Sequence, residues 1–268
     1  MQCRDISQFL KVIACEIALR EICFAAAQSR NLVDLEFLPQ GLHDTPCRGL
    51  VQIQERIEAV PAGKYDAILL GYGLCGNIIR GLKARRTPVV VPRAHDCITF
   101  FLGSKECYQQ MAENHSGAYY YTSGWLEVLR RRGDKAGAVS TVFLPSRAGL
   151  GGGAPAAYAE WVTKYGEEKA RYLLEVMDEW TQHYTHGVLI EFDFARTLKL
   201  REQVEAICAQ RGWQFQELAG DLSLLQRWLD GEWDPKDFLV VPPNRTVVPS
   251  YGETIIQAEV EPGTATPP

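Results

Sequence analysis

The sequence has no long hydrophobic run and no excess of basic charge. No apolar stretch in its 268 residues approaches the roughly 20 that a membrane-spanning helix needs, so we expect no membrane association. The net charge is −5 and the pI is about 5.6, which leaves no broad basic surface for nucleic acid. Charges are scattered through the first 22 residues, unlike a signal peptide. These features predict a cytoplasmic protein with a small-molecule substrate.

Familiar motifs of nucleotide and ester chemistry are also absent. There is neither a P-loop nor a G-x-S-x-G turn. GYGLCG at 71–76 satisfies G-x-G-x-x-G, but it follows the third expected strand instead of the first. A dinucleotide site also has an acidic residue about 20 residues later, which binds the ribose. At that place this sequence has Arg93 and His95 instead. A dinucleotide site is therefore the weaker interpretation, and the glycines also fit a turn whose N–H groups hold a phosphate or carboxylate.

Short apolar runs alternate with helical patterns in the first part of the chain. The expected strands are 9–15, 33–39, 66–70 and 88–91, and the expected helices are 16–30, 50–60 and 77–86. This alternation predicts an α/β fold with parallel, doubly wound sheet segments. A similar pattern returns at the end of the chain, with strands expected at 186–194, 213–221 and 237–243.

Between these two α/β segments lies a middle part of different character. Residues 117–125 look extended and aromatic, and residues 157–184 look helical. We divide the chain into an N-terminal lobe (1–115), an aromatic and helical middle (116–185), a C-terminal lobe (186–250) and a largely disordered tail (251–268). Two Rossmann-like lobes around the middle are favoured over one sheet extended by the second segment.

Cysteine is abundant, with eight residues, and the reducing cytoplasm argues against a disulfide framework. Cys15, Cys75 and Cys97 each follow or end an expected strand. The carboxyl ends of parallel strands share one edge of a sheet, so these residues can meet. His95 lies two residues before Cys97 and can point the same way in an extended segment.

Thiolate and imidazole are the ligands that zinc prefers. We therefore predict a zinc site with the ligands Cys15, Cys75, Cys97 and His95. A free cysteine is often only a small buried hydrophobe, which is our interpretation of Cys23 and Cys208 in their helices.

The remaining candidate residues lie close to these turns or in the aromatic stretch. Asp96 is a potential hydrogen-bond partner of an imidazole ligand. The predicted catalytic residues are Asp96 and Tyr120. The predicted substrate-binding residues are Gly73, Asn77, Arg93, Ser104 and Trp125; Ser104 is equally a candidate helix cap.

The motifs GYGLCGN, PRAHDCITFFLGS and GAYYYTSGW resemble an uncharacterised prokaryotic family, a domain of unknown function, over most of the chain. That resemblance implies a context near corrinoid-dependent methyltransferase systems. The spacing of His95 and Cys97 is also similar to the zinc site of methylcobamide:thiol methyltransferases, which are longer barrels.

Three functions remain open. The first is a zinc–thiolate protein that binds a small polar or thiol substrate; if it is an enzyme, it transfers a methyl or other one-carbon group. The second is an iron–sulfur protein in which three cysteines hold a [4Fe–4S] cluster with one open iron. The third is a non-catalytic metal-binding or delivery partner of a methyltransferase. A corrinoid protein or methyltransferase is the expected macromolecular partner, and a homo-oligomer is possible in each case.

Overall fold

The computed structural model describes residues 7–42, 46–114, 117–132, 162–163, 165–172, 184–250 and 252–260. The chain divides into two compact units, Met1–Met111 with Gly220–Pro268, and Ala112–Ala219. Most of the helical stretch predicted at 157–184 and the end of the predicted tail, from residue 261, lie outside the described residues.

The first unit is built on a five-stranded sheet in the order β2-β1-β3-β4-β8. Its strands are β1 (Phe9–Cys15), β2 (Leu32–Leu38), β3 (Ala67–Gly71), β4 (Val89–Pro92) and β8 (Phe238–Val241). The first four are parallel, and β8 is antiparallel to β4. Every residue of β3 and β4 is buried, as expected of apolar strands covered on both faces.

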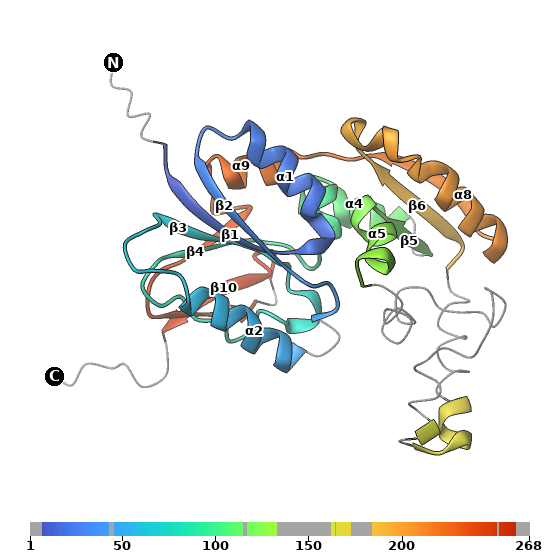
Figure 1. The fold of residues 1–268 in the computed structure, drawn as a ribbon, viewed down its shortest axis with the longest axis horizontal. Helices are drawn as coiled ribbons and strands as arrows, with labels where there is room; N and C mark the ends of the chain where they lie inside the picture. Colours follow the sequence, from blue (N-terminus) through green and yellow to red (C-terminus); the bar gives the residue numbers. More distant parts are fainter. Residues whose placement is uncertain are drawn as a thin grey trace. The chain divides into compact units, whose positions relative to one another are not determined.

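Helices cover both faces of this sheet. Figure 1 shows α1 (Leu19–Gln28) and α9 (Ser223–Leu229) on one face and α2 (Pro46–Glu58) on the other. Trp228 of α9 is fully buried, and its indole N–H donates to the Val90 carbonyl oxygen at 3.3 Å. The α/β fold with parallel sheet segments is confirmed.

Residues 77–86 do not form the predicted helix. A short 3₁₀ turn, η3 (Cys75–Asn77), is followed by turns and an extended segment. The N–H groups of Gly81 and Ala84 donate to the carbonyl oxygens of Val247 and Arg245, at 2.8 and 3.0 Å. Pairing with a distant strand therefore replaces helical hydrogen bonds here, a tertiary effect that local sequence does not contain.

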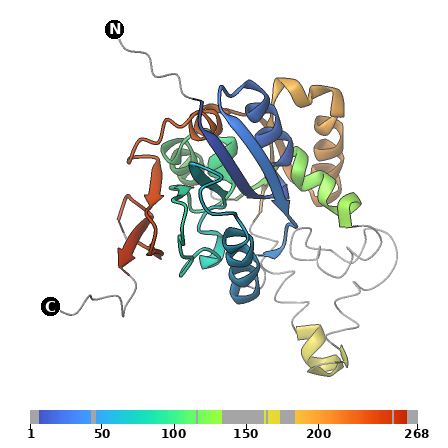
Figure 2. The ribbon, with the colours of Figure 1, turned by 60° about the vertical axis from the view of Figure 1, so that its left-hand side comes forward.

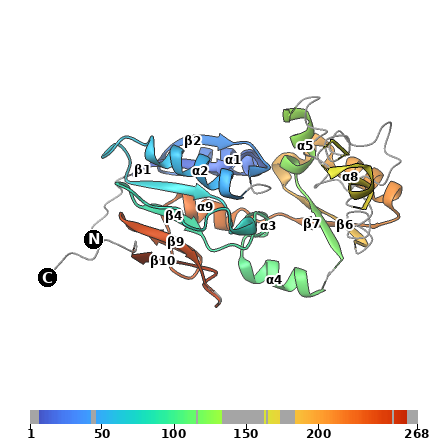
Figure 3. The same cartoon turned by 90° about the horizontal axis from the view of Figure 1, so that it is seen from below.

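That distant strand belongs to a two-stranded antiparallel ribbon, β9 (Arg245–Pro249) and β10 (Ile256–Val260). Figures 2 and 3 show this ribbon, in orange-red, along one side of the first unit. The sequence assigned 256–260 to a largely disordered tail, whereas the structure pairs these residues in β10.

Two short helices follow the end of β4. They are α3 (Ile98–Phe101) and α4 (Lys105–Asn114). A 3₁₀ turn, η1 (Glu16–Ala18), links β1 to α1. These segments, together with η3, follow strand ends and form the carboxyl edge of the first sheet.

The second unit contains a parallel sheet in the order β5-β6-β7. Its elements are β5 (Ala118–Tyr121), α5 (Ser123–Arg132), β6 (His186–Glu191), η5 (Asp193–Leu198), α8 (Leu200–Arg211) and β7 (Gln214–Ala219). The extended segment predicted at 117–125 ends at Tyr121, because α5 begins at Ser123. The strand expected at 237–243 pairs with β4 of the first unit instead of joining this sheet. No helix within the described ranges is long and apolar enough to cross a bilayer.

Candidate functional site

Three cysteines lie at the carboxyl edge of the first sheet. Cys15 is the last residue of β1 and is buried, and Cys75 and Cys97 stand in the turns after β3 and β4. Burial raises the pKa of Cys97, and negative charge on Cys75, Asp96 and Cys15 adds to this effect. Burial also raises the pKa of Cys75, with smaller contributions from the charges of Asp96 and Cys15. Parallel topology thus brings together three residues from distant parts of the sequence.

Backbone hydrogen bonds join the two turns that carry Cys75 and Cys97. The N–H groups of Leu74 and Cys75 donate to the carbonyl oxygens of Ala94 and His95, at 2.9 and 2.8 Å. Gly73 allows this contact, because a Cβ at that position would lie 2.8 Å from the Cα of Asp96. The glycine at position 73 therefore has a packing role beside the site.

The turn after β3 has an unusual backbone. Cys75, Gly76 and Asn77 have φ angles of 39°, 67° and 71°, three successive residues in the left-handed region. This region disfavours residues with a Cβ, and such strain concentrates at functional sites. Asn77, a predicted substrate-binding residue, is exposed at the end of this turn.

Burial is the main influence on the thiols. It raises the pKa of Cys75 to about 12, and the negative charges of Asp96 and Cys15 add to the effect. The N–H groups of Gly73 and Cys97 act in the opposite direction on that pKa, because they donate to the Cys75 sulfur. Burial likewise holds the pKa of Cys97 well above its ordinary value. Without a bound cation, these thiols are protonated at neutral pH.

Several buried polar atoms at this edge have no hydrogen-bond partner among the described residues. They are the Tyr72 hydroxyl, both polar atoms of the Gln40 side chain and the Thr99 hydroxyl. Tyr72 is 4% exposed, and burial, followed by negative charge on Cys15 and Cys75, raises its pKa. The backbone N–H of Gln40 donates to Glu16 Oε1 at 2.9 Å, whereas its side-chain amide has no such bond in the described residues. Buried polar groups are normally satisfied, so these atoms indicate a polar ligand or ordered water.

The sequence did not single out these three residues. Tyr72 lies between the two glycines of GYG, so the motif could have marked it as a residue of the site. No motif marks Gln40 or Thr99, because the positions of their side chains depend on how the chain folds back to the sheet edge.

Asp96 has well-defined hydrogen bonds. Its Oδ1 accepts from the Ile98 N–H at 2.9 Å, and its Oδ2 accepts from the Tyr108 hydroxyl at 2.8 Å. Burial raises the pKa of Asp96, and the hydrogen bond from Tyr108 partly offsets this. The carboxylate thus stabilises the first turn of α3, and its predicted catalytic role stays a prediction.

The other predicted residues of the first unit have different surroundings. His95 is exposed, while its carbonyl oxygen holds the Cys75 turn. The Arg93 guanidinium donates to the carbonyl oxygens of Pro235, Thr254 and Ile256, and so ties the β9–β10 ribbon to β4. Ser104 Oγ accepts from the Cys107 N–H at 3.0 Å, which makes it the cap of α4.

Tyr120 and Trp125 belong to the second unit. The Trp125 indole N–H donates to the Tyr119 hydroxyl at 3.2 Å. Tyr119 also contacts Tyr121 and Tyr184, with ring centroids 5.0 and 5.2 Å apart. These residues form an aromatic cluster in the second unit, and the roles predicted for Tyr120 and Trp125 stay predictions.

Comparison with known proteins identifies the family. A family model described as "Protein of unknown function (DUF1638)" matches residues 37–229. The chain belongs to the DUF1638 family. The uncharacterised family expected from the motifs is thereby confirmed. Cys75 and Cys97 lie within the DUF1638 match, and Cys15 precedes it. No curated protein and no solved structure matches the chain.

The cysteine thiols of this DUF1638 site suit a thiophilic metal such as zinc, but their side chains are not gathered around one point. Within the described ranges, no group of three or more His, Cys, Asp or Glu side chains is placed so that it could hold a metal ion. The three cysteines share one edge of the sheet, and a closed ligand set would require their side chains to turn toward one point.

Proposed function

We propose that the three thiols of Cys15, Cys75 and Cys97 form a centre that takes up zinc and binds a small polar or thiol-bearing substrate. The observation that carries the proposal is their common place at the carboxyl edge of one parallel sheet, at the end of β1 and in the turns after β3 and β4. The strand order β2-β1-β3-β4, with helices on both faces, supports treating this unit as a Rossmann-like lobe that binds its ligand at the carboxyl edge.

Electrostatics give the physical reason. Several neighbouring thiols do not ionise together at neutral pH, since negative charge on one raises the pKa of the next, as charge on Cys75 and Cys15 does for Cys97. A divalent cation removes this penalty and releases the protons, so metal uptake and thiol ionisation are coupled. The N–H groups of Gly73 and Cys97 already favour the ionised form of Cys75.

The buried polar atoms beside the thiols support a polar substrate. The Tyr72 hydroxyl can donate to a substrate oxygen, and the Gln40 amide can both donate and accept. Bound zinc would lower the pKa of a thiol or water at this edge, which makes a nucleophile at neutral pH. Transfer of a methyl or other one-carbon group to a thiol is the reaction class we propose.

Metal analysis of the full chain tests the centre. Protein purified without oxygen and loaded with zinc is expected to hold about one ion, and Cys15→Ser, Cys75→Ser and Cys97→Ser should each lose most of it. The control variants are Cys23→Ser and Cys208→Ser, which lie in α1 and α8 and should keep the metal. Full occupancy in both Cys75→Ser and Cys97→Ser refutes the proposal.

An iron–sulfur cluster is the second candidate. Three thiols and an exposed His95 match a [4Fe–4S] cluster with one iron open to a ligand. Brown protein with absorbance near 400 nm and about four irons would select it over zinc. Stoichiometric metal without turnover of one-carbon donors would instead favour a delivery role for a methyltransferase or corrinoid partner.

A further inference from the structure

A pocket lies at the opposite edge of the first sheet from the cysteines. It has a volume of about 370 Å³ and is lined by Ile57, Glu58, Val60, Ile68, Arg85, Arg86 and Thr87. Ile68 is near the start of β3, and Thr87 comes just before β4, whereas Cys75 and Cys97 follow the ends of these strands. The pocket is therefore separate from the thiol site.

The pocket has an apolar floor and a charged rim. Ile57, Ile68 and Thr87 are buried, while Glu58 and both arginines are exposed. Its volume falls within the range of about 300–1,000 Å³ that is typical of small-molecule sites. Most of the accessible lining is polar, and Val60 is the most exposed apolar side chain, so an occupant would need a polar group at the rim and only a short apolar part.

Hydrogen bonds hold the two walls of the pocket in place. Gln54 of α2 accepts from the Lys83 N–H at 2.9 Å and donates to the Lys83 carbonyl oxygen at 3.2 Å. Arg85 Nε donates to Glu58 Oε1 at 3.0 Å, and Gln54 Nε2 donates to the same oxygen at 3.0 Å. The charge of Glu58 is thus already matched by Arg85.

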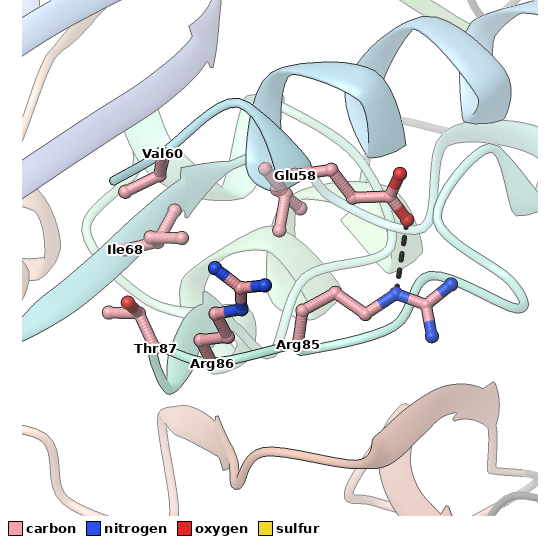
Figure 4. Close-up of a pocket in the computed structure, with 7 residues that line it drawn as sticks. Glu58, Val60, Ile68, Arg85, Arg86 and Thr87 are labelled. Atoms are coloured by element: carbon pink, nitrogen blue, oxygen red, sulfur yellow. Dashed lines mark hydrogen bonds and ion pairs between the residues drawn. The ribbon is translucent and has the colours of Figure 1, made fainter. Parts of the chain in front are cut away.

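Arg86 is the remaining charge. Figure 4 shows its guanidinium directed into the space between Ile68, Thr87 and Glu58, whereas the guanidinium of Arg85 extends along Glu58. No hydrogen bond or ion pair joins the Arg86 side chain to another residue in the described part of the chain. A planar guanidinium in this position can bind a carboxylate or phosphate through two parallel hydrogen bonds.

We propose that this pocket binds a small molecule with a phosphate or carboxylate group held by Arg86 and a short apolar part packed on Val60. One arginine charge is left after Arg85 and Glu58 are paired, so the site favours a single anionic group. The proposal does not depend on metal or on the thiols.

Binding of defined probes to the full chain tests this site. The probes are monobutyl phosphate, pentanoate, inorganic phosphate and 1-butanol, followed by amide chemical shifts in labelled protein. We expect monobutyl phosphate or pentanoate to shift the amides of residues 57–60 and 85–87, and to bind about tenfold more tightly than inorganic phosphate. Butanol should bind weakly, since it lacks the anionic group.

Two variants and one control assign the contacts. Arg86→Gln should weaken binding of the better probe about tenfold or more, because the charged pair of hydrogen bonds is lost. Val60→Ser should weaken that probe but leave inorganic phosphate unchanged. The matched control is Arg80→Gln, an exposed arginine of the same unit outside the pocket, which should bind like the parent.

The proposal is overturned if Arg86→Gln binds like the parent, or if Arg80→Gln weakens binding equally, which would indicate surface charge alone. Equal affinity for inorganic phosphate and the butylated probe would also overturn it. Circular dichroism and the unfolding midpoint check that each variant is folded, and unchanged zinc content separates this result from the thiol site.

Discussion

The backbone N–H of Cys75 donates a 2.8 Å hydrogen bond to the carbonyl oxygen of His95. This bond fixes the turn after β3 against the turn after β4, and so brings Cys75 close to Cys97. The candidate site thus depends on the close approach of two backbones as well as on the thiols themselves.

Gly73→Ala is expected to disturb that approach. Its Cβ would lie 2.8 Å from the Cα and 3.0 Å from the backbone carbon and nitrogen of Asp96, none of which can move without shifting the turn. We expect a loss of about 2–3 kcal/mol in the free energy of unfolding, measured in urea, and reduced zinc uptake.

The control for this variant is Gly76→Ala. A Cβ at Gly76 would meet nothing within 4 Å, although its φ of 67° strains any other residue. It should cost about 1 kcal/mol and keep zinc binding. Equal effects of the two substitutions would argue against the close-contact explanation.

Tyr72→Phe should stabilise the metal-free protein. The Tyr72 hydroxyl is buried without a partner in the described residues, so its removal relieves a desolvation penalty of about 1 kcal/mol. Tyr65→Phe is the matched control, because the Tyr65 hydroxyl donates to Asp34 Oδ2 at 2.5 Å and its loss should destabilise the fold. The thermal unfolding midpoint of both variants measures these changes in stability. A lower midpoint in Tyr72→Phe than in the parent would mean that this hydroxyl has a partner.

Asp96→Asn is expected to change how stability depends on pH. Burial raises the pKa of Asp96 in the folded protein above its ordinary value of 3.8. The protonated carboxyl therefore stabilises the folded parent fully below pH 3.8, and this stabilisation is lost as the pH rises through the folded pKa. Asparagine does not titrate, so the stability of the variant relative to the parent should increase between about pH 4 and pH 7. Any hydrogen bond lost with the substitution adds an offset that does not vary with pH. Urea unfolding over this range measures the difference, and a flat or falling curve would contradict the expectation.

Thiol alkylation should be slow at Cys75 and fast at Cys47. Cys75, whose pKa burial raises to about 12, should react slowly with iodoacetamide at pH 8 in the folded, metal-free chain. Cys47 is exposed and should react first. Peptide mass spectrometry gives the order, with urea-unfolded protein as the control in which both react. Preferential labelling of Cys75 in the folded chain would mean that its thiolate is stabilised at neutral pH.

Arg93→Lys separates structural support from substrate binding. Lysine cannot reproduce the bonds to the carbonyl oxygens of Pro235, Thr254 and Ile256, so we expect a loss of about 1–3 kcal/mol and faster hydrogen exchange in β10. Arg80→Lys, at an exposed position, should be neutral. Full stability with loss of ligand binding in Arg93→Lys would instead support the role predicted from sequence.

Local patterns in the sequence were enough to predict the strands of the two parallel sheets and the helices α1 and α2, but not the β9–β10 ribbon. Continuous apolar runs such as 66–70 and 88–91 are stable in a sheet that is covered on both faces, and β3 and β4 lie at these runs. The neighbourhood of Cys15, Cys75 and Cys97 followed from the same reasoning, since parallel strands end at one edge.

Long-range pairing decided what local patterns did not contain. Residues 81–84 pair with β9 instead of continuing a helix, and β8 joins β4 in the first sheet. The buried side chains of Tyr72 and Gln40, and the arginine-lined pocket between α2 and the segment before β4, likewise depend on contacts between distant segments. Hydrophobic periodicity reports whether a face is buried, but a strand's partner and a side chain's neighbours are determined only when the chain closes on itself.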